Sequence, residues 1–190
     1  MRFLSSVIKE ALYYSAQMHD GQYRKGTKVP YVVHPVLVAF TVSSYTLDDD
    51  IVAAALLHDL LEDCAVTVED LEKKFGKKIA HLVEEVSFLD SEIPNLSWKE
   101  KKSLYVRKIE SNSKESLIII AADKINNMKA YFEALKVDPS KVKSLFRATS
   151  EEYYWYYKAV GEILEKTLHG EEIVAVYFAQ LNTIKNESAG

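Results

Sequence analysis

The stretch of residues 53–67 is the sequence feature that most constrains the fold and function of this chain. It begins as a run of alanine and leucine typical of a buried helix, and four ionisable residues then interrupt it: His58, Asp59, Glu62 and Asp63. In a continuous helix the first and third of these, and likewise the second and fourth, lie one turn apart on a shared face. Buried charges are costly unless they are paired or bind a metal. A helix end with solvated acids is the alternative, but the whole cluster in an apolar frame favours a functional site.

Composition limits the class of protein. The chain has 190 residues, with 48% hydrophobic and 27% charged residues, which is typical of a soluble globular domain with a sizeable core. The net charge of −4 gives no basic footprint for nucleic acid or an anionic membrane, so an anionic ligand needs a local basic patch. Cys64 is the only cysteine, which excludes an internal disulfide and favours a cytoplasmic location. No apolar run approaches the roughly 20 residues of a membrane span.

Glycine and proline are few, six and four in all, which favours long helices and an all-α fold. We expect one domain over residues 1–190, with a motif-bearing core at about 3–131 and C-terminal helices at about 138–185. Ser97 and Glu100 form a capping box, and Thr67 with Asp70 forms a variant of it. Apolar spacing and end signals predict helices at residues 3–19, 34–45, about 51–63, 68–75, 77–88, 98–111, 113–131, from 138 onward, and 171–185.

Smaller features complete this outline. Pro35 and Pro139 suit the first positions of their helices, and loops are expected at residues 20–33 and 89–96. The tail, residues 186–190, is expected to fray. His19 reads as structural or at the rim of the site, and His81 as a surface or core residue. The aromatic run at residues 153–157 lacks basic interleaving, so core packing or a dimer contact is a better interpretation than nucleic-acid stacking.

Asp123 is a second acid inside an apolar segment, directly after residues 117–122. Taken alone, it fits a salt-bridged acid equally well. Beside His34, His58 and Asp59, it is the natural fourth ligand of a metal. Two imidazoles and two carboxylates suit Mn²⁺, Fe²⁺ or Zn²⁺ better than Ca²⁺ or Mg²⁺ alone, and without thiolates the set is unlike a structural zinc site. Four protein ligands leave positions open on a five- or six-coordinate ion for water and substrate.

The remaining polar residues suggest the chemistry. Glu62 or Asp63 would take the proton of an attacking water or protonate a leaving group. Arg24 and Lys25, in the loop at 20–33, would hold phosphate oxygens, whereas Lys28 reads as part of a solvated loop. The residues alone therefore predict a metal-dependent phosphohydrolase.

Four motifs carry a resemblance to a known family: His-Asp-Gly-Gln-Tyr-Arg-Lys at 19–25, Pro-Tyr-Val-Val-His-Pro at 30–35, Ala-Ala-Leu-Leu-His-Asp-Leu-Leu-Glu-Asp at 54–63, and Ala-Asp-Lys-Ile-Asn-Asn-Met at 122–128. In this order they resemble the HD-domain phosphohydrolases, and within them the hydrolase domain of the RelA/SpoT proteins and their small stand-alone relatives. The resemblance covers most of residues 8–131. It implies an all-α fold and removal of the 3′-pyrophosphate from guanosine tetra- or pentaphosphate (ppGpp or pppGpp), the alarmones of the stringent response.

The resemblance also implies residue roles. A divalent metal, usually Mn²⁺, would be bound by His34, His58, Asp59 and Asp123. The catalytic water and proton transfers would be served by Glu62 and Asp63. The nucleotide and its phosphates would face Arg24, Lys25 and Asn127.

The sequence departs from the family pattern at three places. The segment Gly26–Val29 is one residue longer than the usual Ser-Gly-Glu or Ser-Gly-Asp, Cys64 stands where Thr is common, and Glu85–Phe88 replaces the Gly-Val-Thr-Lys of long bifunctional relatives. These changes leave the predicted metal ligands intact, and the longer loop predicts weaker discrimination between bases. The chain is too short for the synthetase and regulatory domains of the long enzymes, so we expect hydrolysis without synthesis.

Two other functions stay open. The same chemistry would serve another nucleotide, such as a nucleoside monophosphate, an adenosine analogue of the alarmone ((p)ppApp), or NADPH. A non-catalytic nucleotide sensor is a third hypothesis, but it has no chemical need for Glu62 and Asp63 beside a metal. A homo-oligomer is compatible with every one of these functions.

Overall fold

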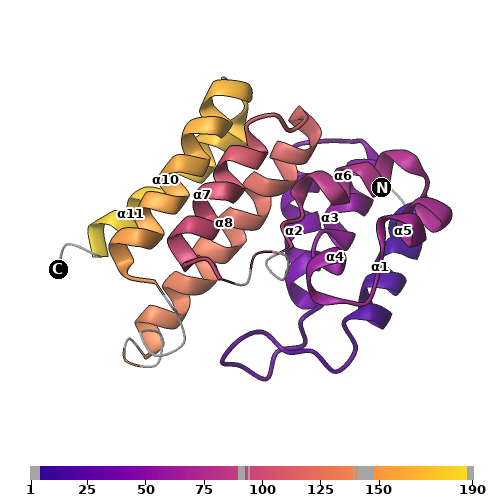
Figure 1. The fold of residues 1–190 in the computed structure, drawn as a ribbon, viewed down its shortest axis with the longest axis horizontal. Coiled ribbons are helices and arrows are strands. Elements are labelled where there is room, and N and C mark those ends of the chain that lie inside the picture. Colours follow the sequence, from indigo (N-terminus) through magenta and orange to yellow (C-terminus); the bar gives the residue numbers. More distant parts are fainter. Residues whose placement is uncertain (1–4, 90–92, 94, 139, 141–147, 188–190) are drawn as a thin grey trace.

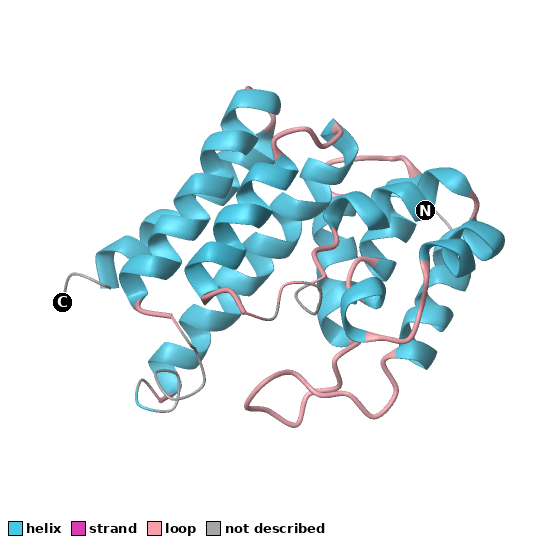
Figure 2. Cartoon of the chain, viewed as in Figure 1, coloured by secondary structure: helices cyan, strands magenta, loops and turns pink. Residues whose placement is uncertain are grey.

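Helices form the regular secondary structure throughout the part of the chain that the structure describes. This computed structural model describes residues 5–89, 93, 95–138, 140 and 148–187 (Figure 1). Within these ranges, β pairing is limited to an isolated bridge between Tyr23 and Pro30 (Figure 2). The all-α expectation is confirmed. No helix in the described ranges combines the length and apolarity needed to cross a bilayer.

The N-terminal group of helices surrounds one buried helix, α3. Every residue from Ile51 to Leu57 in α3 is buried, and α3 packs against α1, α2, α6 and α8. Small alanines at residues 53–55 allow neighbours to approach on several sides of this helix at once. The bounds of the group are α1 (Ser6–Met18), α2 (Val33–Ser43), α3 (Asp49–Leu57), α4 (Leu60–Asp63), α5 (Val68–Phe75) and α6 (Lys77–Val86).

The C-terminal group lies on the left in Figure 1 and is joined to the first group by the long helix α8. This helix packs against α2, α3 and α6 and also against α10 and α11, so it belongs to both groups. The bounds are α7 (Trp98–Ile109), α8 (Lys114–Val137), α10 (Ser150–Thr167) and α11 (Glu172–Glu187).

Capping signals in the sequence correctly located several helix ends. The capping box of Ser97 and Glu100 begins α7, and that of Thr67 and Asp70 begins α5. The Asp48 carboxylate accepts a hydrogen bond from the N–H of Asp50 at the start of α3. Gly76 ends α5 with φ at +85°, a conformation that side chains disfavour.

The prediction of one continuous helix through residues 51–63 was wrong. The helix α3 ends at Leu57, and His58 and Asp59 form a turn before the short α4. The Ala55 carbonyl, which a continuous helix would offer to the N–H of Asp59, lies 2.8 Å from His58 Nδ1. On the far side, the buried Ser87 hydroxyl lies 3.4 Å from the His58 carbonyl. Two contacts therefore accompany the break: one from the His58 imidazole to Ala55, and one from Ser87 to the His58 carbonyl.

Three other predicted boundaries differ from the structure. Helix α8 runs on to Val137, beyond the expected end at residue 131. Pro35 occupies the third position of α2, because the helix begins at Val33. The helix with the aromatic run begins at Ser150 and is capped by Thr149, so it is not the single helix expected from residue 138. Residues 139 and 141–147 of that expectation lie outside the described residues, as do Pro94 of the 89–96 loop and the tail at 188–190.

Two residues of the aromatic run are buried, and the other three are partly exposed. Tyr156 and Tyr157 are buried, and the Tyr156 ring contacts those of Trp98 and Tyr105 at centroid distances of 5.9 and 6.1 Å. The ring centroids of Tyr153 and of Tyr131 in α8 are 5.4 Å apart. These rings join α7, α8 and α10, as the core-packing interpretation requires.

Candidate metal centre

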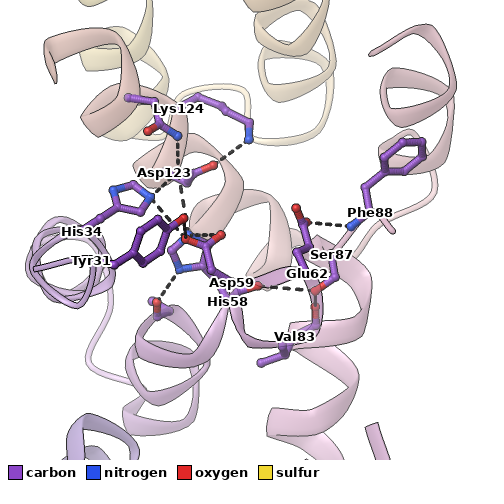
Figure 3. Close-up of polar contacts among 12 residues, drawn as sticks. Tyr31, His34, His58, Asp59, Glu62, Val83, Ser87, Phe88, Asp123 and Lys124 are labelled. Carbon is purple, nitrogen blue, oxygen red and sulfur yellow. Dashed lines mark hydrogen bonds and ion pairs between the residues drawn. The ribbon is translucent and has the colours of Figure 1, made fainter. Parts of the chain in front are cut away.

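Four ligand-type side chains from three parts of the chain meet in the core between the two groups of helices (Figure 3). His34 comes from α2, His58 and Asp59 from the turn after α3, and Asp123 from α8. His34 Nε2 lies 3.0 Å from Asp123 Oδ1, and His58 Nε2 lies 3.1 Å from Asp59 Oδ1. The cross distances are 3.7 Å from His34 to Asp59 and 3.8 Å from His58 to Asp123. The structure therefore brings together all four residues that the sequence analysis proposed as ligands.

The chemistry of this group fits a divalent metal. His34, His58 and Asp59 each offer a ligand atom within 4.8 Å of the others. His58 Nδ1 lies 2.8 Å from the Ala55 carbonyl, which selects the tautomer that leaves Nε2 unprotonated. That Nε2 is buried and makes no hydrogen bond within the described chain, although a carboxylate oxygen is near. A buried imidazole lone pair beside two carboxylates is the donor set that a transition metal prefers.

Electrostatics in the centre favour a positive charge. Burial lowers the pKa of His58, but the carboxylates of Asp59 and Asp123 outweigh it and raise that pKa to about 9. Burial raises the pKa of Asp123, yet Lys124 and His34 hold it well below its ordinary value. The carboxylates are therefore ionised, and the field that stabilises a protonated imidazole also attracts a metal cation.

Two donors from outside the cluster contact its carboxylates. The Tyr31 hydroxyl donates to Asp59 Oδ2 at 2.9 Å, and Lys124 Nζ lies 2.6 Å from Asp123 Oδ2. Sequence reasoning missed both residues. A signal was present, because Tyr31 lies inside the motif at 30–35 and Lys124 inside the motif at 122–128.

Glu62 and Asp63, the predicted proton-transfer residues, project from α4 beside the cluster. Glu62 lines a cavity of about 360 Å³ together with the four ligand-type residues, and its Oε1 accepts a hydrogen bond of 2.8 Å from the Phe88 N–H. Although the side chain is open to solvent, the surrounding pocket desolvates it, and with the negative charge of Asp59 this raises the pKa of Glu62 to about 7. The same two causes raise the pKa of Asp63. The contribution of Phe88 is a backbone group, which no side-chain motif could reveal.

The predicted phosphate-binding residues lie on the neighbouring wall. Arg24 Nη2 donates to Asn127 Oδ1 at 2.9 Å, and Asn127 Nδ2 donates to Asp123 Oδ1 at 2.5 Å. The Arg24 guanidinium also lies 5.5 Å from the centre of the Tyr31 ring. Arg24 and Asn127 line both the first cavity and a larger one of about 750 Å³, which Lys25 borders as well.

Three polar residues that were not predicted to bind metal or substrate lie where the sequence analysis expects them. Lys28 and His81 are exposed. His19 is buried, with Nδ1 2.8 Å from Gln22 Oε1 and its ring 4.7 Å from that of Tyr31. His19 therefore lies behind Tyr31 at the edge of the site, as a structural or rim residue.

Comparison with known proteins identifies relatives of this chain. The profile of the HD domain matches residues 11–154. The chain is 38% identical over 128 residues to a GTP pyrophosphokinase of Myxococcus xanthus, covering 65% of this chain and 17% of that protein. It is 36% identical over 149 residues to a guanosine-3′,5′-bis(diphosphate) 3′-pyrophosphohydrolase of Vibrio cholerae, covering 77% of this chain and 20% of that protein.

A solved structure is similar over nearly the whole chain. It is described as a metazoan ortholog of SpoT that hydrolyzes ppGpp, and it aligns with a TM-score of 0.74 and 28% identity over 98% of both chains. By contrast, the chain spans about a fifth of the length of the curated relatives it matches. The matched profile covers most of this sequence and includes all four ligand-type residues. The chain belongs to the HD-domain family, with RelA/SpoT-type proteins among its relatives.

Proposed function

We propose that this chain is a metal-dependent hydrolase that removes pyrophosphate from the 3′ position of guanosine 3′,5′-bis(diphosphate), as ppGpp or pppGpp. The observation that carries the proposal is one cavity lined by two imidazoles, four carboxylates and an arginine. A binding module needs a cation and an anion site, but it has no need for two extra acids with raised pKa values. The similarity to the metazoan SpoT ortholog over 98% of both chains supports the choice of substrate.

The proposed metal ligands are His34, His58, Asp59 and Asp123, and the proposed ion is Mn²⁺, with Fe²⁺ or Zn²⁺ as alternatives. When bound, a divalent cation activates water and polarises a phosphoryl oxygen. The protein contributes a fixed donor set, because His58 is oriented by the Ala55 carbonyl and the two aspartates by Tyr31 and Lys124.

Glu62 and Asp63 are the proposed proton carriers. In the reaction, water adds to the phosphorus next to the 3′ oxygen, the bond to that oxygen breaks, and the oxygen takes up a proton. Glu62, with a pKa of about 7, can both accept and release a proton near neutral pH. The hydrogen bond from the Phe88 N–H fixes one of its oxygens and leaves the other for the water.

Substrate binding is proposed to rest on Arg24, Lys25 and Asn127. Arg24 offers a planar fork to phosphate oxygens, and its bond to Asn127 aims it at the cavity. The adjoining cavity of about 750 Å³ is large enough for a nucleoside and has aromatic walls that include Trp98 and Tyr131. A phosphorylated nucleotide therefore fits this site better than a simple phosphate.

The test is a nucleotide panel with metal-loaded protein, and chromatography to identify the products. The panel holds guanosine and adenosine 3′-pyrophosphates, nucleoside monophosphates and NADPH. We expect GDP and pyrophosphate from ppGpp, with a smaller rate for the adenosine analogue. Arg24→Ala should raise KM for the 3′-pyrophosphates by about 10- to 100-fold, the effect of losing a charge-assisted bond, and should change KM for monophosphates less.

A preference for plain monophosphates or NADPH that Arg24→Ala leaves untouched would reject the alarmone proposal and favour the other nucleotide. No turnover of any nucleotide by metal-loaded protein would favour the sensor hypothesis. Organisation as one unit over residues 1–190, the cytoplasmic location and a homo-oligomeric state stay predictions.

A further inference from the structure

Lys124, which orients the proposed ligand Asp123, contacts only one of its two carboxylate oxygens. Its Nζ lies 2.6 Å from Asp123 Oδ2, and the two side chains are only 15% and 10% exposed. Adjacent residues of a helix do not normally face each other, so this contact requires that the lysine chain be held in place. The Tyr105 ring, 5.1 Å from Nζ, supplies a cation–π contact that holds it.

This contact gives the two carboxylate oxygens of Asp123 different partners. Oδ2 faces Lys124, whereas Oδ1 lies 3.0 Å from His34 Nε2 (Figure 3). Oδ1 also accepts a hydrogen bond from Asn127 Nδ2. The two oxygens of Asp59 also have different partners. Tyr31 donates to Oδ2, and His58 Nε2 lies 3.1 Å from Oδ1. In each aspartate, one oxygen is held by a donor outside the cluster and the other is directed at an imidazole.

The two outside donors differ in charge. Tyr31 offers a phenol hydroxyl, whereas Lys124 offers an ammonium group on a side chain that is only 15% exposed. Two ligand carboxylates neutralise a divalent ion. Among the ion, these two ligands and Lys124, one positive charge is then left over, in a cavity that is also lined by the ionisable side chains of Arg24, Lys102, Glu62 and Asp63.

We propose that Lys124 is a positioning residue of the metal centre with two separable effects. It occupies Asp123 Oδ2, so that the carboxylate offers a single oxygen to the metal, and its charge favours the binding of a polyanionic substrate. This inference rests on the metal-dependent function proposed above. It assigns Lys124 no contact with the reacting atoms.

The test compares two variants by Co²⁺ titration and by calorimetry with inorganic pyrophosphate. Lys124→Met removes both the donor and the charge. We expect it to keep Co²⁺ but to change the visible absorption band, because the freed Oδ2 can join the metal. Lys124→Gln keeps a donor for Oδ2 but no charge, so the band should stay as in the wild type. Both variants should bind pyrophosphate about tenfold more weakly than wild-type protein, because a nearby charge is lost.

Lys102→Met is the matched control. Its ammonium lies over the Tyr105 and Tyr156 rings at 5.8 and 5.3 Å, so the variant removes an equal charge from the same aromatic group. The Co²⁺ band should not change in this variant. A merely structural role of Lys124 would lower the melting temperature and leave the band of the remaining folded protein unchanged.

Two outcomes overturn the inference while leaving the proposed function intact. One is a Lys124→Met protein with the wild-type Co²⁺ band, and the other is wild-type affinity for pyrophosphate in Lys124→Gln. If Lys124→Met does not fold, the pyrophosphate affinity of Lys124→Gln decides. Wild-type protein that binds no Co²⁺ would overturn the metal centre itself, so the two failures are distinguishable.

Discussion

The two ring nitrogens of His58 have different environments. Nδ1 is 2.8 Å from a carbonyl of the preceding helix, and Nε2 is buried beside carboxylates without a hydrogen-bond partner in the described chain. A neutral imidazole in this position leaves a buried polar atom unsatisfied, which costs about 1–3 kcal/mol. A proton or a metal ion on Nε2 removes that cost, so the unpartnered lone pair of His58 favours a bound cation.

We expect His58→Ala to remove most of the bound metal. Loss of a residue that only orients a ligand lowers metal affinity by about 10- to 100-fold, and loss of a ligand should exceed this. Elemental analysis after Mn²⁺ loading and desalting measures the effect. His81→Ala, which removes an exposed histidine of α6, is the control and should keep its metal. Equal metal content in the two variants would contradict the site.

Glu62→Gln and Asp63→Asn should separate metal binding from chemistry. Neither residue is a proposed ligand, so metal content should stay near that of the wild type. Turnover should fall by about 10²-fold or more in at least one variant, because a general acid or base is lost. Single-turnover kinetics on ppGpp measure this. Wild-type turnover in both variants would mean that another group carries the proton.

At the residue scale, the sequence predicted the cluster but not its supports. Ionisable residues in apolar surroundings are conspicuous, which is why His58, Asp59 and Asp123 were found. Tyr31 and Lys124 were missed because a tyrosine or lysine near a loop or helix has many ordinary roles. Only the fold shows that each donates to a particular carboxylate oxygen.

Among the elements, the end of α6 has an unusual cap supplied by another helix. Lys108 of α7 donates to the carbonyls of Glu84, Glu85 and Ser87 at 2.9, 2.9 and 2.5 Å. A cation at a helix C-terminus satisfies carbonyls that have no partner within the helix. The cap also fixes the backbone just before Phe88, whose N–H contacts Glu62.

Lys108→Met should destabilise the protein by about 1–3 kcal/mol, since three carbonyls lose a charged donor. Urea unfolding monitored by circular dichroism measures the change. Lys158→Met is the control, because the pair of Lys158 and Glu162 is exposed and such pairs contribute within about 0.5 kcal/mol. An unchanged urea midpoint for Lys108→Met would show that water replaces the lysine at no cost.

Helix starts were predictable where the signal is local. The capping boxes before α5 and α7 consist of residues three apart, and they form as expected. The break at His58 was not predictable from periodicity, because alanine, leucine and the acids that follow all tolerate a helix. What accompanies the break is a contact of the imidazole with Ala55 and of Ser87 with the turn, and the second of these spans 29 positions.

At the scale of the whole molecule, the candidate centre belongs to no single segment. Its ligand-type residues come from α2, the turn after α3, and α8, and α8 also carries the packing of α10 and α11. A metal ion bound by all four residues would hold together helices that are distant in sequence. Metal binding and global stability are therefore coupled.

Mn²⁺ at about 100 times its dissociation constant should stabilise the folded state by ~2.7 kcal/mol and raise the melting temperature by roughly 5–10 °C. Differential scanning calorimetry with and without metal measures the shift, and a chelator should reverse it. His58→Ala should melt at the same temperature in both conditions. An equal shift in that variant would mean that the metal binds elsewhere.

The hydrogen bond from the Phe88 N–H to Glu62 has a consequence for variation among sequences. The donor is main chain, so the identity of the side chain at position 88 does not affect it, and any residue except proline supplies the same N–H. The replacement of Gly-Val-Thr-Lys by Glu85–Phe88 therefore leaves this anchor of a proposed catalytic acid in place. An alignment column at position 88 can vary freely while the atom that matters stays constant, so conservation scores would overlook it.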